Sequence, residues 1–349
     1  IMSGILMMII AIVVLGGAYL LYGRYLQNKW GIDPNAKTPA YELEDGVDYV
    51  PADTNVVFGH QFASIAGAGP INGPIQAAIF GWLPVMLWIL IGGVFFGAVQ
   101  DFASMYASVK NKGRTIGYII EEYIGKLGKK LFLLFCWLFC ILVVAAFADV
   151  VAGTFNGFAT SESGAVTKVV ANGAVATTSM LFIIEAVALG FFLKYSKFNK
   201  WVNTAVAVIL LVVAIALGLN FPIYVSLGTW HLIIFAYILI ASVTPVWALL
   251  QPRDYLNSYL LIFMILGAVI GVFVANPACN LEAFTAFSIP DANGNPQYMF
   301  PILFVTIACG AVSGFHSLVS SGTASKQIKN EKNMLPVSFG AMLMESMLA

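Results

Sequence analysis

Residues 59–74 read GHQFASIAGAGPINGP, an apolar stretch that holds four glycines and two prolines. Within a helix interior each glycine costs about 1 kcal/mol and each proline about 3 kcal/mol, so one unbroken helix is not expected here. Broken backbone at bilayer depth is tolerated only where it faces protein or a watery cavity. We therefore expect two half-helices within residues 56–80, whose freed amide and carbonyl groups form a binding site. The alternative is a glycine-rich surface on which a neighbouring helix packs closely.

The composition of the whole chain indicates a membrane protein. Its 349 residues are 60% hydrophobic and 10% charged, whereas about 25% charged residues are usual in soluble domains. Lys plus Arg equals Asp plus Glu at 17 each, which gives no basic surplus for nucleic acid and leaves the lipid bilayer as the expected partner. The four cysteines form no CxxC pair and have no histidine at a zinc-like spacing, so no metal site, cofactor or redox centre is predicted.

The predicted fold is all-α, a polytopic bundle of transmembrane helices. Crossing about 30 Å of hydrocarbon takes roughly 20 helical residues. Runs of this kind lie near residues 4–22, 82–108, 131–158, 178–194, 201–219, 230–250, 257–275 and 300–322. A further run begins near Leu335 and is still apolar at Ala349, so we expect the bundle to be C-terminally incomplete.

Lysine and arginine in the short loops predict the orientation. If the broken segment at 56–80 crosses the membrane, the basic clusters near residues 24–37, 110–130, 194–200, 253 and 326–332 all fall on one side, and Lys168 alone falls on the other. This places the basic loops in the cytoplasm and the N-terminus outside. Residues 1–22 are then a peripheral transmembrane helix and residues 23–55 a cytoplasmic loop.

Two further crossings carry polar groups beside helix breakers. Pro245 falls within one crossing, preceded by Ser242 and Thr244, whose hydroxyls can bond the freed backbone; a simple proline kink explains the same pattern. The crossing at 300–322 ends in Ser320, Ser321 and Thr323. Clustered hydroxyls can bind a sodium-like ion, or they make interhelical hydrogen bonds of about 0.6 kcal/mol each.

Ionisable groups inside membrane helices are costly and usually functional. Glu185 and Glu345 are two of them, but the predicted proton-coupling residues are His60, Asp101, Asp149 and His316, with Asp149 the most deeply placed. A structural hydrogen-bonding role is the alternative for each. No nucleophile–base pair or dinucleotide loop occurs in a usable context, so we predict that the protein is not an enzyme.

Long motifs resemble the carbon starvation protein A family. They are DGVDYVPAD (45–53), FGHQFASIAGAGP (58–70), GAVQDF (97–102), PVWALLQPRDYL (245–256), ACGAVSGFHSLVSSGT (308–323) and GAMLMES (340–346). Gln61 stands where many members have a second histidine. The resemblance implies uptake of peptides, or of pyruvate with a proton, across the bacterial inner membrane during carbon starvation. It also implies an inverted-repeat transporter fold with discontinuous helices, so that residues 56–349 are the transporter core, with core helices 1 to 8 and the start of 9.

We therefore expect a secondary active transporter of peptides or small carboxylates such as pyruvate. The predicted substrate site lies between Ala66, Gly67, Ala68, Gly69 and Pro70 on one side and Ser242, Thr244 and Pro245 on the other. Peptide or pyruvate as substrate, H⁺ or Na⁺ as coupling ion, and the oligomeric state stay open. A membrane sensor that binds a solute without transport is the alternative function, and a membrane enzyme is the weakest of the three.

Overall fold

The computed structural model describes residues 2–160, 165–195, 199–245, 249–291 and 294–349. These residues are mostly helical with several long loops, and their few strands form three two-stranded pairs. Six helices are long and apolar enough to cross a membrane: Gly4–Lys29, Trp82–Lys110, Lys126–Phe155, Val170–Phe192, Trp201–Asn220 and Pro252–Ala275. A shorter apolar helix covers Leu227–Val243. The all-α, multi-pass membrane architecture predicted from composition is confirmed.

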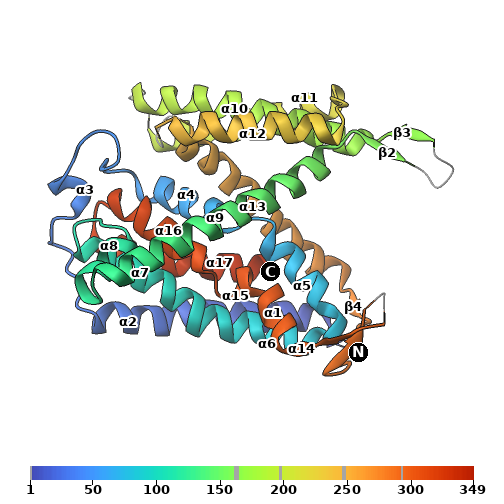
Figure 1. Cartoon of the computed structure of the whole chain (residues 1–349), viewed down its shortest axis with the longest axis horizontal. Coiled ribbons are helices and arrows are strands. Elements are labelled where there is room, and N and C mark those ends of the chain that lie inside the picture. The colour runs from blue at the N-terminus through green and yellow to red at the C-terminus, as the bar shows by residue number, and fades with distance from the viewer. Residues whose placement is uncertain (1, 161–164, 196–198, 246–248, 292–293) are drawn as a thin grey trace. The chain divides into compact units, whose positions relative to one another are not determined.

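The chain divides into two compact units. Unit 1 comprises Ile1–Ile120 and Leu261–Ala349, and unit 2 comprises Glu121–Leu260. Figure 1 labels many of their helices and strands and colours the chain from blue at the N-terminus to red at the C-terminus. These units differ from the division predicted from sequence into residues 1–22, 23–55 and 56–349, which stays a prediction.

Unit 1 begins with one long helix in three parts, and a second follows the same plan. In each, a π-helical turn separates two α-helical segments, and such turns often occur at functional sites. The elements of this first half are β1 (Met2–Ser3), α1 (Gly4–Gly17), η1 (Ala18–Gly23), α2 (Arg24–Lys29), α3 (Pro39–Glu42), α4 (Thr54–Ile65), α5 (Gly69–Ala77), η2 (Ala78–Phe80), α6 (Trp82–Ile91), η3 (Gly92–Gly97) and α7 (Ala98–Lys110).

Two helices connect the units in sequence, α8 (Ile116–Tyr123) and α13 (Leu250–Ala275). In the described residues, the rest of unit 1 consists of three short strands and seven short helices. They are β4 (Ala278–Cys279), β5 (Ser288–Pro290), β6 (Pro296–Tyr298), α14 (Met299–Thr306), α15 (Ala308–Ala311), α16 (Gly314–Gly322), η4 (Ala324–Lys326), η5 (Glu331–Asn333), η6 (Leu335–Gly340) and α17 (Ala341–Leu348). Strand β1 pairs with β4, and β5 pairs with β6, both antiparallel.

Unit 2 is a helical layer with one small hairpin. Its elements are α9 (Lys126–Phe155), β2 (Phe158–Thr160), β3 (Val166–Lys168), α10 (Val170–Tyr195), α11 (Lys200–Asn220) and α12 (Leu227–Val243). Helix α10 packs along α11, and α9 packs against α12 and α10 (Figure 1). Phe155 and Trp230 meet edge to face with ring centroids 5.1 Å apart, where the end of α9 packs against the first turn of α12.

Several predicted helix bounds are wrong in instructive ways. The N-terminal helix continues to Lys29 rather than residue 22, and α10 begins at Val170 rather than residue 178, because polar residues such as Asn172 and Thr177 are accommodated by hydrogen bonds. The crossing expected at 300–322 is three helices, with non-helical Val312 between α15 and α16. Hydropathy reports the apolar run and does not detect such breaks.

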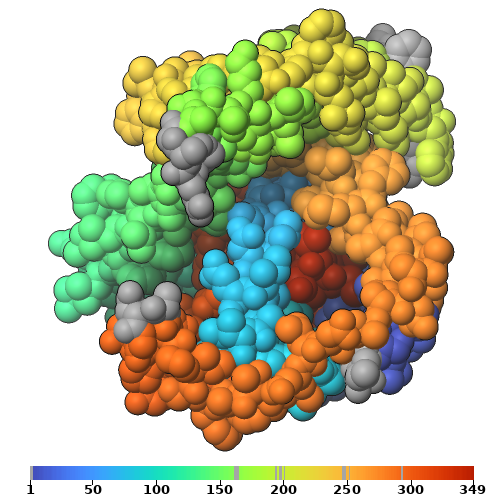
Figure 2. Space-filling view, turned by 90° about the vertical axis from the view of Figure 1, so that its right-hand side faces the viewer, coloured from blue at the N-terminus to red at the C-terminus, as the bar shows by residue number. Residues whose placement is uncertain are grey.

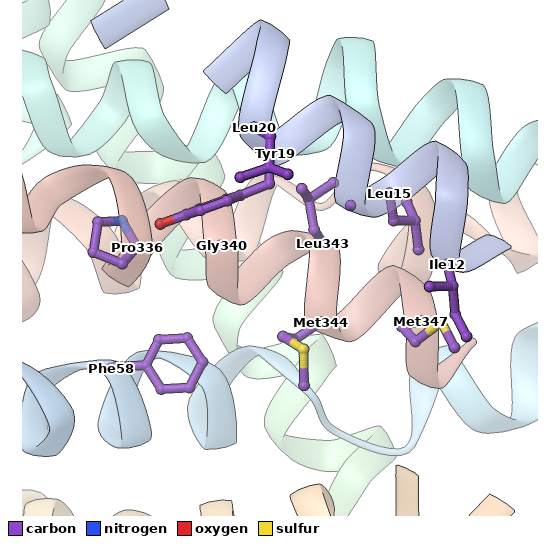
Figure 3. Close-up of a pocket in the computed structure, with 11 residues that line it drawn as sticks. Ile12, Leu15, Tyr19, Leu20, Phe58, Pro336, Gly340, Leu343, Met344 and Met347 are labelled. Carbon is purple, nitrogen blue, oxygen red and sulfur yellow. The ribbon is translucent and has the colours of Figure 1, made fainter. Parts of the chain in front are cut away.

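The packed centre of unit 1 includes Val57, Phe102, Met105 and Phe339. Beside it lies an apolar pocket of about 470 Å³, between α1, η1, α4, η6 and α17 (Figure 3). Among the side chains that line it, only Tyr19 carries a polar atom, the hydroxyl oxygen in Figure 3. A carboxylate placed there would lose its hydration with one partner in return, so the pocket does not fit an anionic solute.

Candidate functional site

The break predicted within residues 56–80 is confirmed. Helix α4 ends at Ile65, residues 66–68 are not helical, and α5 begins at Gly69 with Pro70 in its first turn. Proline fits this position because its missing N–H would have no helical partner there. Of the five residues predicted to bind substrate here, Gly67 is exposed, whereas Ala66 and Pro70 are buried.

Close packing accounts for two of the glycines in this stretch. A Cβ on Gly69 would stand 2.7 Å from Cys309 Cβ, and one on Gly73 would stand 2.3 Å from the carbonyl oxygen of Thr306. Helix α5 therefore lies directly against α14 and α15, and Figure 2 shows the light-blue residues of this segment beside orange ones. At Gly69 and Gly73 the glycines therefore allow close helix contact, as the alternative interpretation proposed. The backbone break between α4 and α5 is present as well.

The second break separates α15 from α16. Val312 is extended, and Ser313 is the extended residue before α16. The Gln100 side-chain amide donates to the Ser313 carbonyl at 2.9 Å, and the Ser346 hydroxyl donates to the Gly310 carbonyl at 2.9 Å. Side chains from α7 and α17 thus stabilise backbone carbonyls that the interrupted helix leaves without helical donors.

A buried polar cluster lies beside this second break. His316 Nδ1 is 3.1 Å from Asp101 Oδ2, and His316 Nε2 is 3.2 Å from Glu345 Oε2, all with fully buried side chains. Cys309 Sγ lies 3.4 Å from Glu345 Oε1. We call Asp101, Cys309, His316 and Glu345 the acid–histidine–thiol cluster.

Local helix geometry positions the two acids of this cluster. Asp101 follows the π-helical turn η3 by one turn of α7, and Glu345 follows η6 in the same way on α17. Each acid is next to the side chain that bonds the α15–α16 break, Gln100 beside Asp101 and Ser346 beside Glu345. Both helices therefore present a pair of neighbouring residues to the break and to His316.

Two of the three hydroxyls predicted to bind a coupling ion have protein partners. Gln61 Nε2 donates to Ser320 Oγ at 2.9 Å, and Gln61 is the residue that stands where a second histidine was expected. Ser321 Oγ donates to the Ser317 carbonyl at 2.7 Å, and Thr323 follows the last residue of α16. These bonds match the structural alternative for Ser320 and Ser321, and the ion-binding role stays a prediction.

The segment at residues 242–245 lies in unit 2. Helix α12 ends at Val243, and Thr244 and Pro245 are non-helical, so the predicted interruption near Pro245 is present. The hydroxyls of Ser242 and Thr244 donate to the carbonyls of Leu239 and Ile240 in the same helix, each at 2.8 Å. Residues 246–248 of this motif lie outside the described residues.

Three of the four predicted proton-coupling residues belong to unit 1, and Asp149 belongs to unit 2. Asp101 and His316 meet in the cluster, and His60 is buried on α4. Asp149, expected to be the most deeply placed, has a 75% exposed side chain and lies 3.0 Å from His231 Nε2. The depth of a residue along an apolar run does not say which way its side chain faces.

Cys309 is the member of the cluster that the sequence did not identify, and Glu345 was a candidate ionisable group without a predicted partner. Glu345 can be recognised from the sequence as a carboxylate in an apolar run. Its contact with the same histidine as Asp101 could not be predicted, because the two acids are 244 residues apart in the sequence. Cys309 has no CxxC partner or nearby histidine pattern, since His316 reaches it across a break.

The sequence is similar to a described protein family over almost its whole length. The model of the family described as carbon starvation protein CstA matches residues 3–349. The peptide transporter CstA of Escherichia coli K12 is 36% identical over 95% of this chain and 47% of its own length. The pyruvate/proton symporter BtsT of the same organism is 38% identical over 95% of this chain and 46% of its own length.

The peptide transporter CstA of Bacillus subtilis 168 is 36% identical over 99% of this chain and 57% of its own length. The chain thus spans about half the length of these curated relatives, all of which are named as transporters. No solved structure matches it significantly. The family match over nearly all residues shows that the chain belongs to the carbon starvation protein CstA family.

Proposed function

We propose that this protein imports peptides or small carboxylates such as pyruvate across the bacterial inner membrane, with protons as the coupling ion. The names of its relatives support this substrate class, and the relative named as a pyruvate/proton symporter supports protons over sodium. Peptides and pyruvate share a carboxylate, so one anion-binding feature could serve both.

The open amino end of α16 carries the proposal. Gly314, its first residue, is exposed, and a Cβ placed there would have no atom within 4 Å among the described residues. The first amides of a helix have no partner within it, and a helix N-terminus carries about half a positive charge. Because helix N-termini readily bind anions, we propose that the substrate carboxylate meets the first turn of α16.

The start of α5 supports this choice by contrast. It was the predicted carboxylate site, but Gly69 is packed against Cys309, and Pro70 supplies no N–H. Of the predicted residues at this break, Gly67 is the exposed one. We propose that Gly67 and its neighbours contribute backbone groups at the edge of the site, and that α16 holds the charge.

Uptake by proteoliposomes tests the proposal. The full-length protein should accumulate labelled pyruvate or a labelled dipeptide when an inward proton gradient is imposed, and an inward sodium gradient alone should give no accumulation. If neither solute accumulates under either gradient, the transport function is wrong. If one of these solutes binds to the protein in the same vesicles but does not accumulate inside them, the result would instead indicate the alternative function, a membrane sensor.

A matched pair of variants tests the position of the site. Gly314→Phe should reduce uptake at least tenfold, since the ring would occupy the open first turn of α16. Gly228→Phe is the control, because Gly228 lies in the first turn of α12 and also has open space around it. Equal uptake by both variants would contradict the α16 site.

A further inference from the structure

Three elements bring three different metal-ligand types together inside unit 1. Cys309 comes from α15, His316 from α16 and Glu345 from α17, and their ligand atoms all lie within 4.8 Å of one another. A thiolate sulfur, an imidazole nitrogen and a carboxylate oxygen form a donor set typical of zinc and neighbouring divalent transition metals.

The spacing of these atoms suits coordination to one ion. With metal–ligand distances of about 2.0–2.3 Å, two ligands of a tetrahedral site lie roughly 3.3–3.6 Å apart. His316 Nε2 is 3.2 Å from Glu345 Oε2, and Cys309 Sγ is 3.4 Å from Glu345 Oε1. The His316 nitrogen and Cys309 Sγ lie within 4.8 Å of one another, so these two side chains must approach each other to reach tetrahedral spacing around one ion.

Asp101 orients the histidine for this role. A carboxylate can only accept a hydrogen bond, so the 3.1 Å contact makes His316 Nδ1 the donor and leaves Nε2 facing Glu345. Metal-binding histidines usually donate their other ring N–H to such a carboxylate. His316 is thus held in the tautomer that a metal ion requires.

The buried atoms that face one another lack well-formed hydrogen bonds. Within the part of the chain that the structure describes, neither His316 Nε2 nor Glu345 Oε2 has a hydrogen-bond partner of good geometry, and the Cys309 thiol lies beside both residues. They are close enough for an ion pair, but their geometry is not that of a hydrogen bond. Buried polar atoms without partners are rare and often mark an absent ion or water.

We propose that Cys309, His316 and Glu345 bind a divalent transition metal of the zinc type, with Asp101 as a positioning residue. A cation here would offset the charge of two carboxylates and a thiolate, whose burial without compensation is costly. Three protein ligands leave a fourth coordination position for water or another small ligand. This site goes beyond the proposed transport function and does not depend on it.

Cobalt(II) is the probe, because sulfur ligation to cobalt gives a distinctive charge-transfer absorption. The purified full-length protein is stripped with a chelator in detergent and titrated with Co²⁺. We expect one Co²⁺ per chain and the sulfur-to-cobalt band. Cys309→Ser should lose the band and Cys279→Ser should keep it, while Asp101→Asn should weaken binding about 10–100-fold. Absent stoichiometric binding, or an unchanged band in Cys309→Ser, would overturn the site.

A measurement on the unaltered sequence covers the case in which a variant does not fold. The rate of thiol alkylation at each cysteine is followed by mass spectrometry with and without Zn²⁺. Zn²⁺ should slow alkylation of Cys309 at least tenfold and leave Cys279, a free cysteine in the strand β4, unchanged. Equal rates at Cys309 in both conditions would refute metal binding there.

Discussion

Asp101 in unit 1 and Asp149 in unit 2 look alike in sequence and differ in structure. Each is an acidic residue within an otherwise apolar helix. The carboxylate of each lies about 3 Å from a histidine of another helix, His316 for Asp101 and His231 for Asp149. The Asp101 pair is fully buried, whereas the side chains of Asp149 and His231 are 75% and 42% exposed. Asp101 therefore belongs to an enclosed polar cluster with Glu345 and Cys309 beside its histidine, whereas Asp149 forms an exposed pair.

The largest expected effect compares these two aspartates. Asp101→Ala should lower the free energy of unfolding by about 3 kcal/mol, because it leaves His316 buried beside a single acid. Asp149→Ala should cost about 0.6 kcal/mol, the usual size of a polar contact between membrane helices. Thermal unfolding in detergent micelles measures both, and similar losses for the two variants would remove the distinction.

Glycine packing gives the next largest expected loss of stability. A Cβ on Gly97 would stand 2.4 Å from the Ala311 carbonyl oxygen, so Gly97→Ala should destabilise unit 1 by about 2 kcal/mol. Gly153 on α9 has open space, and Gly153→Ala should gain up to about 1 kcal/mol from helix propensity. Unfolding midpoints that shift in the same direction would contradict the close contact at Gly97.

Ion pairs at the ends of the membrane helices should differ more modestly. Glu331 is 96% buried, accepts from Lys110 Nζ at 2.7 Å and also accepts the Asp33 amide at 2.9 Å, whereas Glu121 of unit 2 is one-third exposed in its pair with Lys129. Glu331→Gln should cost about 1–2 kcal/mol and Glu121→Gln less than about 1 kcal/mol. Denaturation of the two variants in parallel tests this ranking.

The smallest effect concerns an exposed acid in the loop between α3 and α4. Amide hydrogen bonds from Val47, and also from Tyr49 and Asp48, hold the pKa of Asp45 below its usual value. Because the pKa is lower in the folded loop, ionised Asp45 stabilises the loop at pH values above the ordinary pKa of aspartate. This stabilisation is lost as the pH falls through the folded-state pKa. Amide protection at 47–49 should therefore drop below about pH 4; in Asp45→Asn it should be weaker and independent of pH.

Much of the fold was predictable from the sequence because hydropathy directly reports contact with lipid. The broken stretch between α4 and α5 was predictable too, since the energetic cost of Gly69, Pro70 and Pro74 within one helix depends on local sequence alone. The break at Val312 was missed because neither Val312 nor Ser313 is a strong helix breaker. Hydrogen bonds from the Gln100 and Ser346 side chains stabilise the backbone at this break. They are tertiary contacts, which the local sequence does not reveal.

The candidate site was predictable only in part. Asp101 and His316 were identifiable as costly groups in apolar helices, but pairing them required the packing of α7 against α16. Cys309 is not identifiable as a metal ligand from the sequence, because metal motifs are recognised by short spacings and its partners here lie 7 and 36 residues further along. Asp149 stays a predicted proton-coupling residue, and its 75% exposed side chain shows that a position within an apolar run does not predict burial.

The central claim is that the open first turn of α16 binds an anionic solute, and thiol labelling tests it most directly. Gly314→Cys and Gly228→Cys place a thiol in the first turn of α16 and of α12, two glycine positions with open surroundings. The full-length protein is labelled with a water-soluble maleimide, with and without saturating pyruvate or dipeptide. We predict that at least one of these solutes slows labelling at position 314 and leaves position 228 unchanged. Equal labelling rates at position 314 with and without either solute would contradict the account.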